Sequence, residues 1–142
     1  IVVTGPQLDA ASFEAIAAQA APGTQVHRSW PGLGSQIAEA AAVISMGGYN
    51  TVCEILATST PALIVPREKP RLEQAIRARA LSRASAVDTA RQEAATPALP
   101  PRRLAGAVST RTDRSHVELG GLAAAARAAA RLLTRTPEGE LT

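Results

Sequence analysis

The sequence predicts an α/β fold, a Rossmann-like three-layer αβα sandwich built on a parallel sheet. Short apolar segments alternate along the chain with segments of helical periodicity. The apolar segments lack polar alternation, which is typical of strands buried on both faces. A glycine pair also joins one of these segments directly to a helix-forming one. Because crossovers between parallel strands are right-handed, all strand-to-helix loops are expected at one edge of the sheet.

Each element is predicted from its apolar pattern and its flanking glycine or proline residues. Phe13, Ile16 and Ala20 fall on one helical face, and Pro22-Gly23 ends that helix. Ile1–Thr4 is a β-branched run that stops at Gly5-Pro6. The predicted elements are strands over 1–4, 25–29, 42–45, 62–65 and 86–87, and helices over 11–21, 35–41, 51–59, 72–84 and 102–108.

A long amphipathic helix is expected near the C-terminus. Ser115-x-x-Glu118 has the pattern of a capping box that would open it. Its apolar stripe consists of Leu119, Leu122, Ala126, Ala129 and Leu133. The proline-rich stretch 96–101 is expected to be a loop, and the polar stretch 136–142 a frayed tail.

Length and composition indicate one domain over residues 1–142, of the soluble globular class. No apolar run is long enough to span a bilayer, and no signal peptide is recognisable. The first residue is Ile1, so we expect a domain cut from a longer protein. The single cysteine, Cys53, fits a reducing, cytoplasmic compartment and is expected to be a buried core residue.

Charge and aromatic content narrow the classes of partner. Residues 1–66 carry one basic and four acidic side chains, whereas 67–142 carry fourteen basic and eight acidic ones. This basic half is compatible with phosphate ligands or with a peripheral contact to an anionic membrane, and also with plain solvated helix faces. With one residue each of Phe, Tyr and Trp, a nucleic-acid partner is not expected. His27 and His116 lack the spacing of metal ligands.

Two strand–loop–helix units carry the candidate chemistry. In the first, the strand at 42–45 leads through Gly47-Gly48 into a helix. Bare backbone N–H groups and a positive helix N-terminus are then brought together, as in phosphate sites of α/β proteins. In the second, the strand at 62–65 leads into a charged loop and a helix. Loops 5–6, 47–48 and 67–71 are expected to line one crevice.

The two units together resemble a known family. The segments Gly47-Gly48-Tyr49-Asn50-Thr51-x-x-Glu54 and Pro66-Arg67…Pro70-Arg71-x-Glu73-Gln74 are similar to the C-terminal, donor-binding domain of GT-B glycosyltransferases of family 28. That group includes the peptidoglycan N-acetylglucosaminyltransferase. More narrowly, the Met-Gly-Gly-Tyr-Asn-Thr segment resembles a bacterial family of predicted glycosyltransferases.

The resemblance implies a role for each motif residue. Gly47, Gly48 and the helix start at Asn50 and Thr51 would face the diphosphate of a nucleotide-diphosphate sugar, such as a UDP-sugar. Glu54 would accept hydrogen bonds from ribose hydroxyls. The remaining contacts are expected from Arg67 and Arg71 to the diphosphate, and from Glu73 and Gln74 to the transferred sugar. Met46 and Glu73 depart from the peptidoglycan enzyme, which has arginine and glutamine at these places.

The same resemblance implies transfer of a hexosyl group without a cofactor or metal, and the chain has no Asp-x-Asp motif. The acceptor site and catalytic base would lie on an N-terminal domain, so this domain alone is expected to be inactive. The alternatives are a sugar-nucleotide epimerase or hydrolase of the same architecture, a donor subunit that pairs with a second chain, and a non-catalytic interaction domain.

Simpler interpretations of the motif residues also stand. Thr51-Val52-Cys53-Glu54 has the pattern of a capping box, with Thr51 as the N-cap. Gly47-Gly48 fits a tight turn, and Glu73-Gln74 fits an ordinary helix start. Arg67 and Arg71 fit solvated charges, and Trp30 fits a packing residue.

Overall fold

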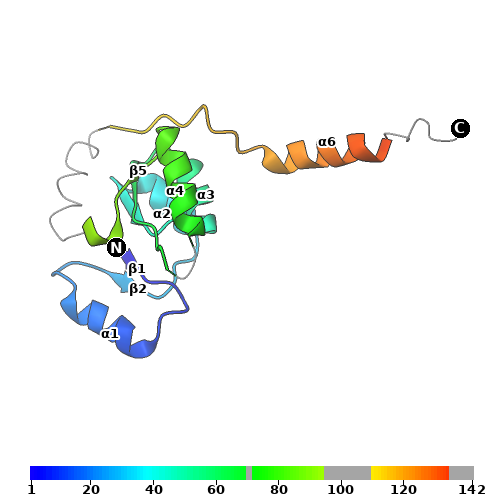
Figure 1. The fold of residues 1–142 in the computed structure, drawn as a ribbon. Coiled ribbons are helices and arrows are strands. Elements are labelled where there is room, and N and C mark those ends of the chain that lie inside the picture. Colours follow the sequence, from blue (N-terminus) through cyan, green and yellow to red (C-terminus); the bar gives the residue numbers. More distant parts are fainter. Residues whose placement is uncertain (70–71, 95–109, 135–142) are drawn as a thin grey trace, which may run out of the picture.

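The computed structural model describes residues 1–69, 72–94 and 110–134 (Figure 1). The predicted alternation of strands and helices is confirmed, and the fold is Rossmann-like α/β. The elements are β1 (Val2–Val3), α1 (Ala10–Gln19), β2 (Val26–His27), α2 (Leu33–Glu39), β3 (Val43–Ser45), α3 (Tyr49–Leu56), β4 (Ala62–Ile64), α4 (Glu73–Arg83), β5 (Asp88–Thr89), the 3-10 turn η1 (Gln92–Ala94) and α6 (Gly121–Thr134). The predicted loop 96–101, helix 102–108 and tail 136–142 lie outside the described residues.

The strands form two parallel sheets rather than the single sheet that the sequence predicts. β1 pairs with β2, and β3, β4 and β5 form the second sheet in that order. No ladder joins β1 to β3 among the described strands, and Ile44 on β3 is 48% exposed. Strands of two or three residues offer few ladder bonds, and an apolar pattern identifies a strand without specifying its partner. Figure 1 shows β1, β2 and α1 together at one side of the larger sheet.

The hydrophobic core forms around β4, the middle strand of the larger sheet. All three of its residues are buried, and Ile64 has no exposed surface. Ile37 of α2, Ile55 of α3 and Ala78 of α4 pack with it in one cluster. Burial of each large aliphatic side chain contributes about 1.5–3 kcal/mol. This core fixes the carboxyl ends of β3 and β4 relative to α3 and α4.

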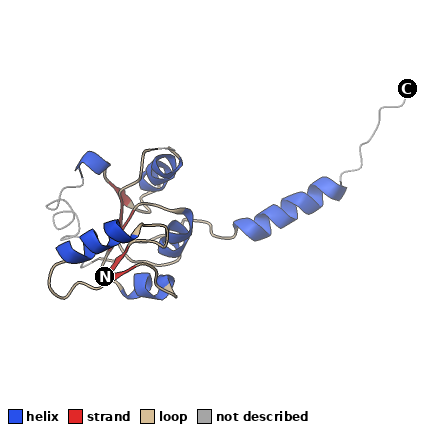
Figure 2. Cartoon of the chain, turned by 90° about the horizontal axis from the view of Figure 1, so that it is seen from below, coloured by secondary structure: helices blue, strands red, loops and turns tan. Residues whose placement is uncertain are grey.

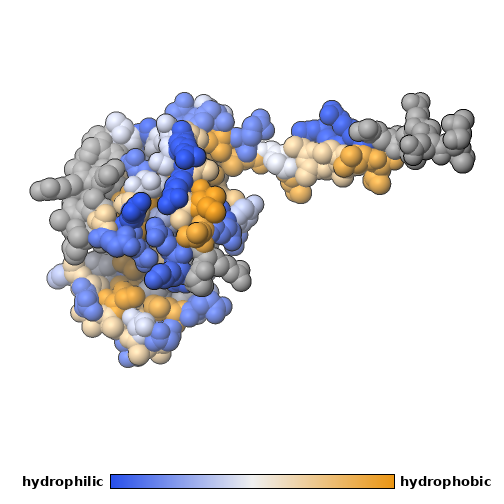
Figure 3. All heavy atoms as spheres, in the orientation of Figure 1, coloured by the Kyte–Doolittle hydropathy of each residue, from blue (hydrophilic) through white to orange (hydrophobic). Residues whose placement is uncertain are grey.

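A C-terminal segment, residues 110–117, binds across the amino end of β4. The Thr112 N–H donates to the Ser59 carbonyl at 2.8 Å, and the Arg114 side chain is buried beneath it. Beyond this segment, α6 projects away from the rest of the chain (Figures 1 and 2). Its leucines are exposed, with Leu122 at 89% and Leu133 at 87%. Apolar and polar residues occupy opposite sides of α6 in Figure 3.

Three local predictions are wrong. Ser115 does not cap the last helix, because its own N–H donates to Asp113 Oδ1 at 2.9 Å and the helix begins at Gly121. The last strand is Asp88–Thr89 instead of 86–87, and the Ala86 carbonyl instead accepts from Arg114 Nε. Cys53 is exposed, because Val52 and Ile55 occupy the buried face of α3. None of the helices within the described residues is long and apolar enough to cross a membrane.

Candidate functional site

The two candidate loops lie side by side at the carboxyl edge of the larger sheet. β3 and β4 pair in parallel, with Ser45 opposite Ile64, so the glycine turn and the loop after β4 leave the sheet at the same end. The Val65 N–H donates to the Ser45 carbonyl at 2.8 Å and continues this pairing. The structure therefore brings together the motifs around Gly47 and Arg67. The loop at Gly5, predicted to share their crevice, follows β1 of the other sheet.

The first half of the glycine turn requires glycine. Gly47 has φ +78°, in the left-handed region that glycine adopts without strain. A Cβ atom at this position would lie 2.8 Å from Ile64 Cγ2, which is closer than real Cβ contacts. The Gly47 N–H donates to Ser45 Oγ at 3.1 Å. The turn is thus held tightly against the buried end of β4.

The second half of the turn opens α3. Gly48 is the N-cap, with φ −57° and ψ 147°, and its carbonyl accepts from the Val52 N–H at 2.9 Å. Thr51 therefore lies in the first turn, and the predicted capping box with Glu54 is wrong. The N-cap lies three residues before the predicted one, Thr51, because glycine is itself a favourable N-cap residue although it has no capping side chain. Within the described residues, the N–H groups of 48–51 have no protein acceptor.

Arg77 on α4 reaches this turn and was not predicted as a site residue. Its Nη1 donates to the Gly47 carbonyl at 3.0 Å, and its guanidinium lies over the Tyr49 ring, 5.4 Å from the centroid. Its Nη2 forms an ion pair with Glu73, one helical turn earlier. The only local signal for Arg77 is this spacing of four residues between opposite charges on a helix.

The loop after β4 is tied to the start of α4. Gln74 Oε1 accepts from the Arg67 N–H at 3.1 Å, so one end of the Gln74 amide holds the loop. Glu73 is exposed, with its carboxylate directed to Arg77. The Arg67 side chain is exposed, and Arg71 lies outside the described residues. Glu73 and Gln74 do begin a helix, as the simpler interpretation expects.

Glu54 is on α3, and its side chain faces the start of α2. Its side chain is partly buried, and its Cγ would be 3.7 Å from a Cβ placed on Gly34, in the first turn of α2. Its carboxylate accepts no hydrogen bond from the described part of the chain. The loop before α2 holds Trp30, whose ring packs edge-on against His27 with the centroids 4.3 Å apart.

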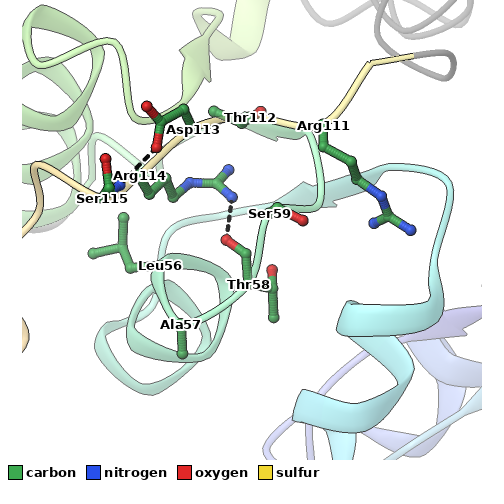
Figure 4. Close-up of a pocket in the computed structure, with 9 residues that line it drawn as sticks. All are labelled: Leu56, Ala57, Thr58, Ser59, Arg111, Thr112, Asp113, Arg114 and Ser115. Atoms are coloured by element: carbon green, nitrogen blue, oxygen red, sulfur yellow. Dashed lines mark hydrogen bonds between the residues drawn. The ribbon is translucent and has the colours of Figure 1, made fainter.

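A pocket of about 400 Å³ lies at the opposite edge, at the amino end of β4 (Figure 4). The Arg114 guanidinium donates there to three carbonyls, those of Ala86 (2.7 Å), Thr58 (2.7 Å) and Thr60 (2.9 Å). Burial lowers the pKa of Arg114, and hydrogen bonding to the Ser115 N–H lowers that of Asp113. Figure 4 shows the Arg111 side chain directed away from Arg114 and Asp113. This pocket is remote from the glycine turn and contains none of the predicted site residues.

The match of the sequence to a family model identifies the family of this α/β domain. Residues 2–131 match the model for the glycosyltransferase family 28 C-terminal domain. The chain belongs to this family. Among curated proteins, none matches the chain.

The family 28 assignment covers both candidate loops and the segment with Arg114. It confirms the predicted relationship, and the parallel α/β architecture agrees with it. This family 28 C-terminal domain is therefore part of a glycosyltransferase, and the glycine turn with the start of α3 is its candidate donor site.

Proposed function

We propose that this domain binds the nucleotide-diphosphate sugar from which a hexosyl group is transferred to an acceptor. The proposal is carried by the backbone N–H groups of residues 48–51 beside the Gly47 turn, which have no acceptor among the residues that the structure describes. They lie at the N-terminus of an eight-residue helix, where the dipole favours an anion. Family membership supports a sugar nucleotide as that anion.

In the proposed complex, the diphosphate lies at Gly47, Gly48 and the first turn of α3, which contains Asn50 and Thr51. Charge that develops on the departing diphosphate is met by donors that are already oriented, which lowers the barrier to breaking the glycosidic bond. Arg67 belongs to the adjacent loop and adds positive charge there. Arg71 lies outside the described residues, and its contact with the diphosphate is proposed from the sequence alone. The proposal assigns no role to a metal ion or other cofactor.

The remaining contacts divide between the nucleoside and the sugar. The Glu54 carboxylate, which accepts no hydrogen bond from the described residues, is suited to accept from the two ribose hydroxyls. Glu73 and the Gln74 amide N–H₂ are suited to bind sugar hydroxyls from the other side of the turn. Uridine is one of the bases to be tested.

The acceptor site and the catalytic base are assigned to a partner N-terminal domain. Residues 1–142 alone are then expected to bind donor without turnover. A cytoplasmic location, with a peripheral contact to an anionic membrane surface, is part of the same proposal, as is a bacterial source.

Titration of the full chain with UDP, GDP and dTDP, followed by ¹⁵N–¹H NMR, tests the donor site. The expected result is saturable shifts at Gly48, Tyr49, Asn50 and Glu54 for at least one nucleotide, with or without EDTA. The matched nucleosides should bind at least about tenfold more weakly, because they lack the charge-assisted contacts. If no nucleotide shifts these resonances, or if EDTA abolishes the shifts, the corresponding part of the proposal is wrong.

A further inference from the structure

We propose that Arg77 is a positioning residue that sets the direction of the Gly47–Gly48 peptide, so that the Gly48 N–H faces the diphosphate. The inference rests on the proposed function of the turn. It starts from the hydrogen bond of 3.0 Å between Arg77 Nη1 and the Gly47 carbonyl oxygen. Arg77 lies outside the two sequence motifs, 47–54 and 66–74, that predict the donor site.

The peptide geometry explains why this bond matters. In a trans peptide the C=O and N–H groups point in opposite directions. When Arg77 holds the Gly47 carbonyl on the α4 side, the Gly48 N–H is directed to the other side. A flip of this peptide would replace the N–H with a carbonyl oxygen, which repels an anion. Both flanking residues are glycines, so no Cβ opposes such a flip.

The other contacts of the turn do not fix this peptide. Ser45 Oγ accepts from the Gly47 N–H, which belongs to the preceding peptide. The Val52 N–H holds the Gly48 carbonyl, which belongs to the following one. Ile64 limits the position of the Gly47 Cα without acting on its carbonyl. Among contacts within the described residues, the bond from Arg77 is the one made to the Gly47–Gly48 peptide.

Arg77 is itself held in place from two sides. Glu73 accepts from its Nη2, and the Tyr49 ring lies under the guanidinium. The Arg77 side chain is only 20% exposed, whereas that of Glu73 is 67% exposed. The planar guanidinium of Arg77 donates to Glu73 and to the Gly47 carbonyl through two different nitrogens. A lysine side chain is shorter and carries a single nitrogen, so it cannot make both bonds in the same geometry.

The test compares Arg77→Gln and Arg77→Lys with the control Arg79→Gln. Arg79 is on the same helix and exposed, so its substitution removes the same charge without touching the turn. Inorganic pyrophosphate, UDP, GDP and dTDP are titrated into each variant of the 142-residue chain, and the Gly48 amide resonance is recorded with and without pyrophosphate. Circular dichroism and thermal melting establish that each variant is folded.

We expect Arg77→Gln to weaken binding of pyrophosphate and nucleoside diphosphates by about tenfold, the loss of one oriented charge-assisted contact. Its Gly48 amide should be shifted or broadened before any ligand is added. Arg79→Gln should differ from wild type by less than about twofold, a change too small to indicate a lost contact. Arg77→Lys should keep the fold and restore less than half of the lost affinity.

The two proposals fail in different ways. If wild type binds none of these anions, the proposed function is wrong. If wild type binds but Arg77→Gln matches Arg79→Gln, the positioning role is wrong while the donor site stands. Full rescue by Arg77→Lys with an unshifted Gly48 amide would show that positive charge alone suffices, which also overturns the positioning role. If Arg77→Gln does not fold, Arg77→Lys and its Gly48 amide decide the question.

Discussion

Ile64 lies so close to Gly47 that a methyl group on the Gly47 Cα would come within 2.8 Å of Ile64 Cγ2. The contact couples the candidate site to the centre of the core, because Ile64 is fully buried in β4. Gly48, the next residue, has φ −57° and open space around its Cα. The two adjacent glycines therefore serve different purposes, the first structural and the second available to a ligand.

Replacement of Gly47 by alanine should destabilise the domain by about 2–4 kcal/mol. Alanine would be strained at the left-handed φ of this position, and its Cβ would collide with Ile64 Cγ2. Gly48→Ala should lower the free energy of unfolding by less, about 1 kcal/mol, because alanine is a much poorer N-cap than glycine but meets no close contact at this position. Urea denaturation measures both. Equal destabilisation by the two substitutions would contradict the geometry of the turn.

Gly48→Ala should nevertheless weaken nucleoside diphosphate binding, since the added Cβ would occupy open space at the N-terminus of α3, where the diphosphate is proposed to bind. A loss of about tenfold or more corresponds to one displaced contact. Calorimetric titration with UDP, GDP and dTDP measures this, and wild-type affinity in the stable Gly48→Ala variant would argue against a ligand at this turn.

Substitutions at Glu54 and Thr51 separate donor binding from helix capping. Since Gly48 caps α3, Thr51→Ala and Glu54→Gln should each change the free energy of unfolding by less than about 0.5 kcal/mol. Glu54→Gln should weaken nucleotide binding about tenfold by loss of a charged acceptor for ribose. Deoxyribose nucleotides serve as the control, because they should be less sensitive to Glu54→Gln. A large loss of stability in either variant would restore the capping interpretation.

The sequence predicts the elements well because periodicity and glycine or proline boundaries are local properties. β4 and Ile64 lie where the apolar run places them. Strand pairing is not local, so the split between β1 and β3 could not be read from the same pattern. Its residue type alone predicts Cys53 in the core, whereas the position of Cys53 on α3 places it on the exposed face.

The same distinction applies to the site. Gly47 and Gly48 were recognisable because their order in the chain creates the turn. Arg77 and Arg79 look alike in sequence, and only the placement of α4 against the turn directs Arg77 to the Gly47 carbonyl. The burial of Arg114 could not be predicted from the sequence either, because the carbonyls of Ala86 and Thr60 that accept from it lie more than twenty residues away along the chain.

Removal of the Arg114 side chain should be the most disruptive arginine substitution among the described residues. Arg114→Ala leaves three carbonyls without their charged donor, and we expect a loss of about 3–5 kcal/mol. Arg111→Ala is the control, because Arg111 is exposed and its bonds to Thr60 and Ala38 are longer, at 3.1 and 3.4 Å. It should cost about 1 kcal/mol or less. A urea midpoint for Arg114→Ala as high as those of Arg111→Ala and wild type would show that the three carbonyl contacts of Arg114 are not essential to the fold.

Asp9 should make the stability of α1 depend on pH. Its side chain caps the helix by accepting from the Ser12 N–H at 2.8 Å, and this bond lowers the pKa of Asp9 below the ordinary 3.8. A lowered pKa means that the carboxylate stabilises the folded state at pH values above 3.8, and that this contribution is lost as pH falls through the lower folded value.

Asp9→Asn keeps a good N-cap without a charge, so it isolates the titration from the capping itself. The difference in unfolding free energy between wild type and Asp9→Asn should be constant from neutral pH to about pH 5 and should shrink below it. Asp9→Ala should be less stable than Asp9→Asn at every pH. Hydrogen exchange of the α1 amides, measured across this range, reports the same change locally. A wild-type advantage over Asp9→Asn that grows as pH falls would have the wrong sign for a carboxylate that is stabilised in its ionised form.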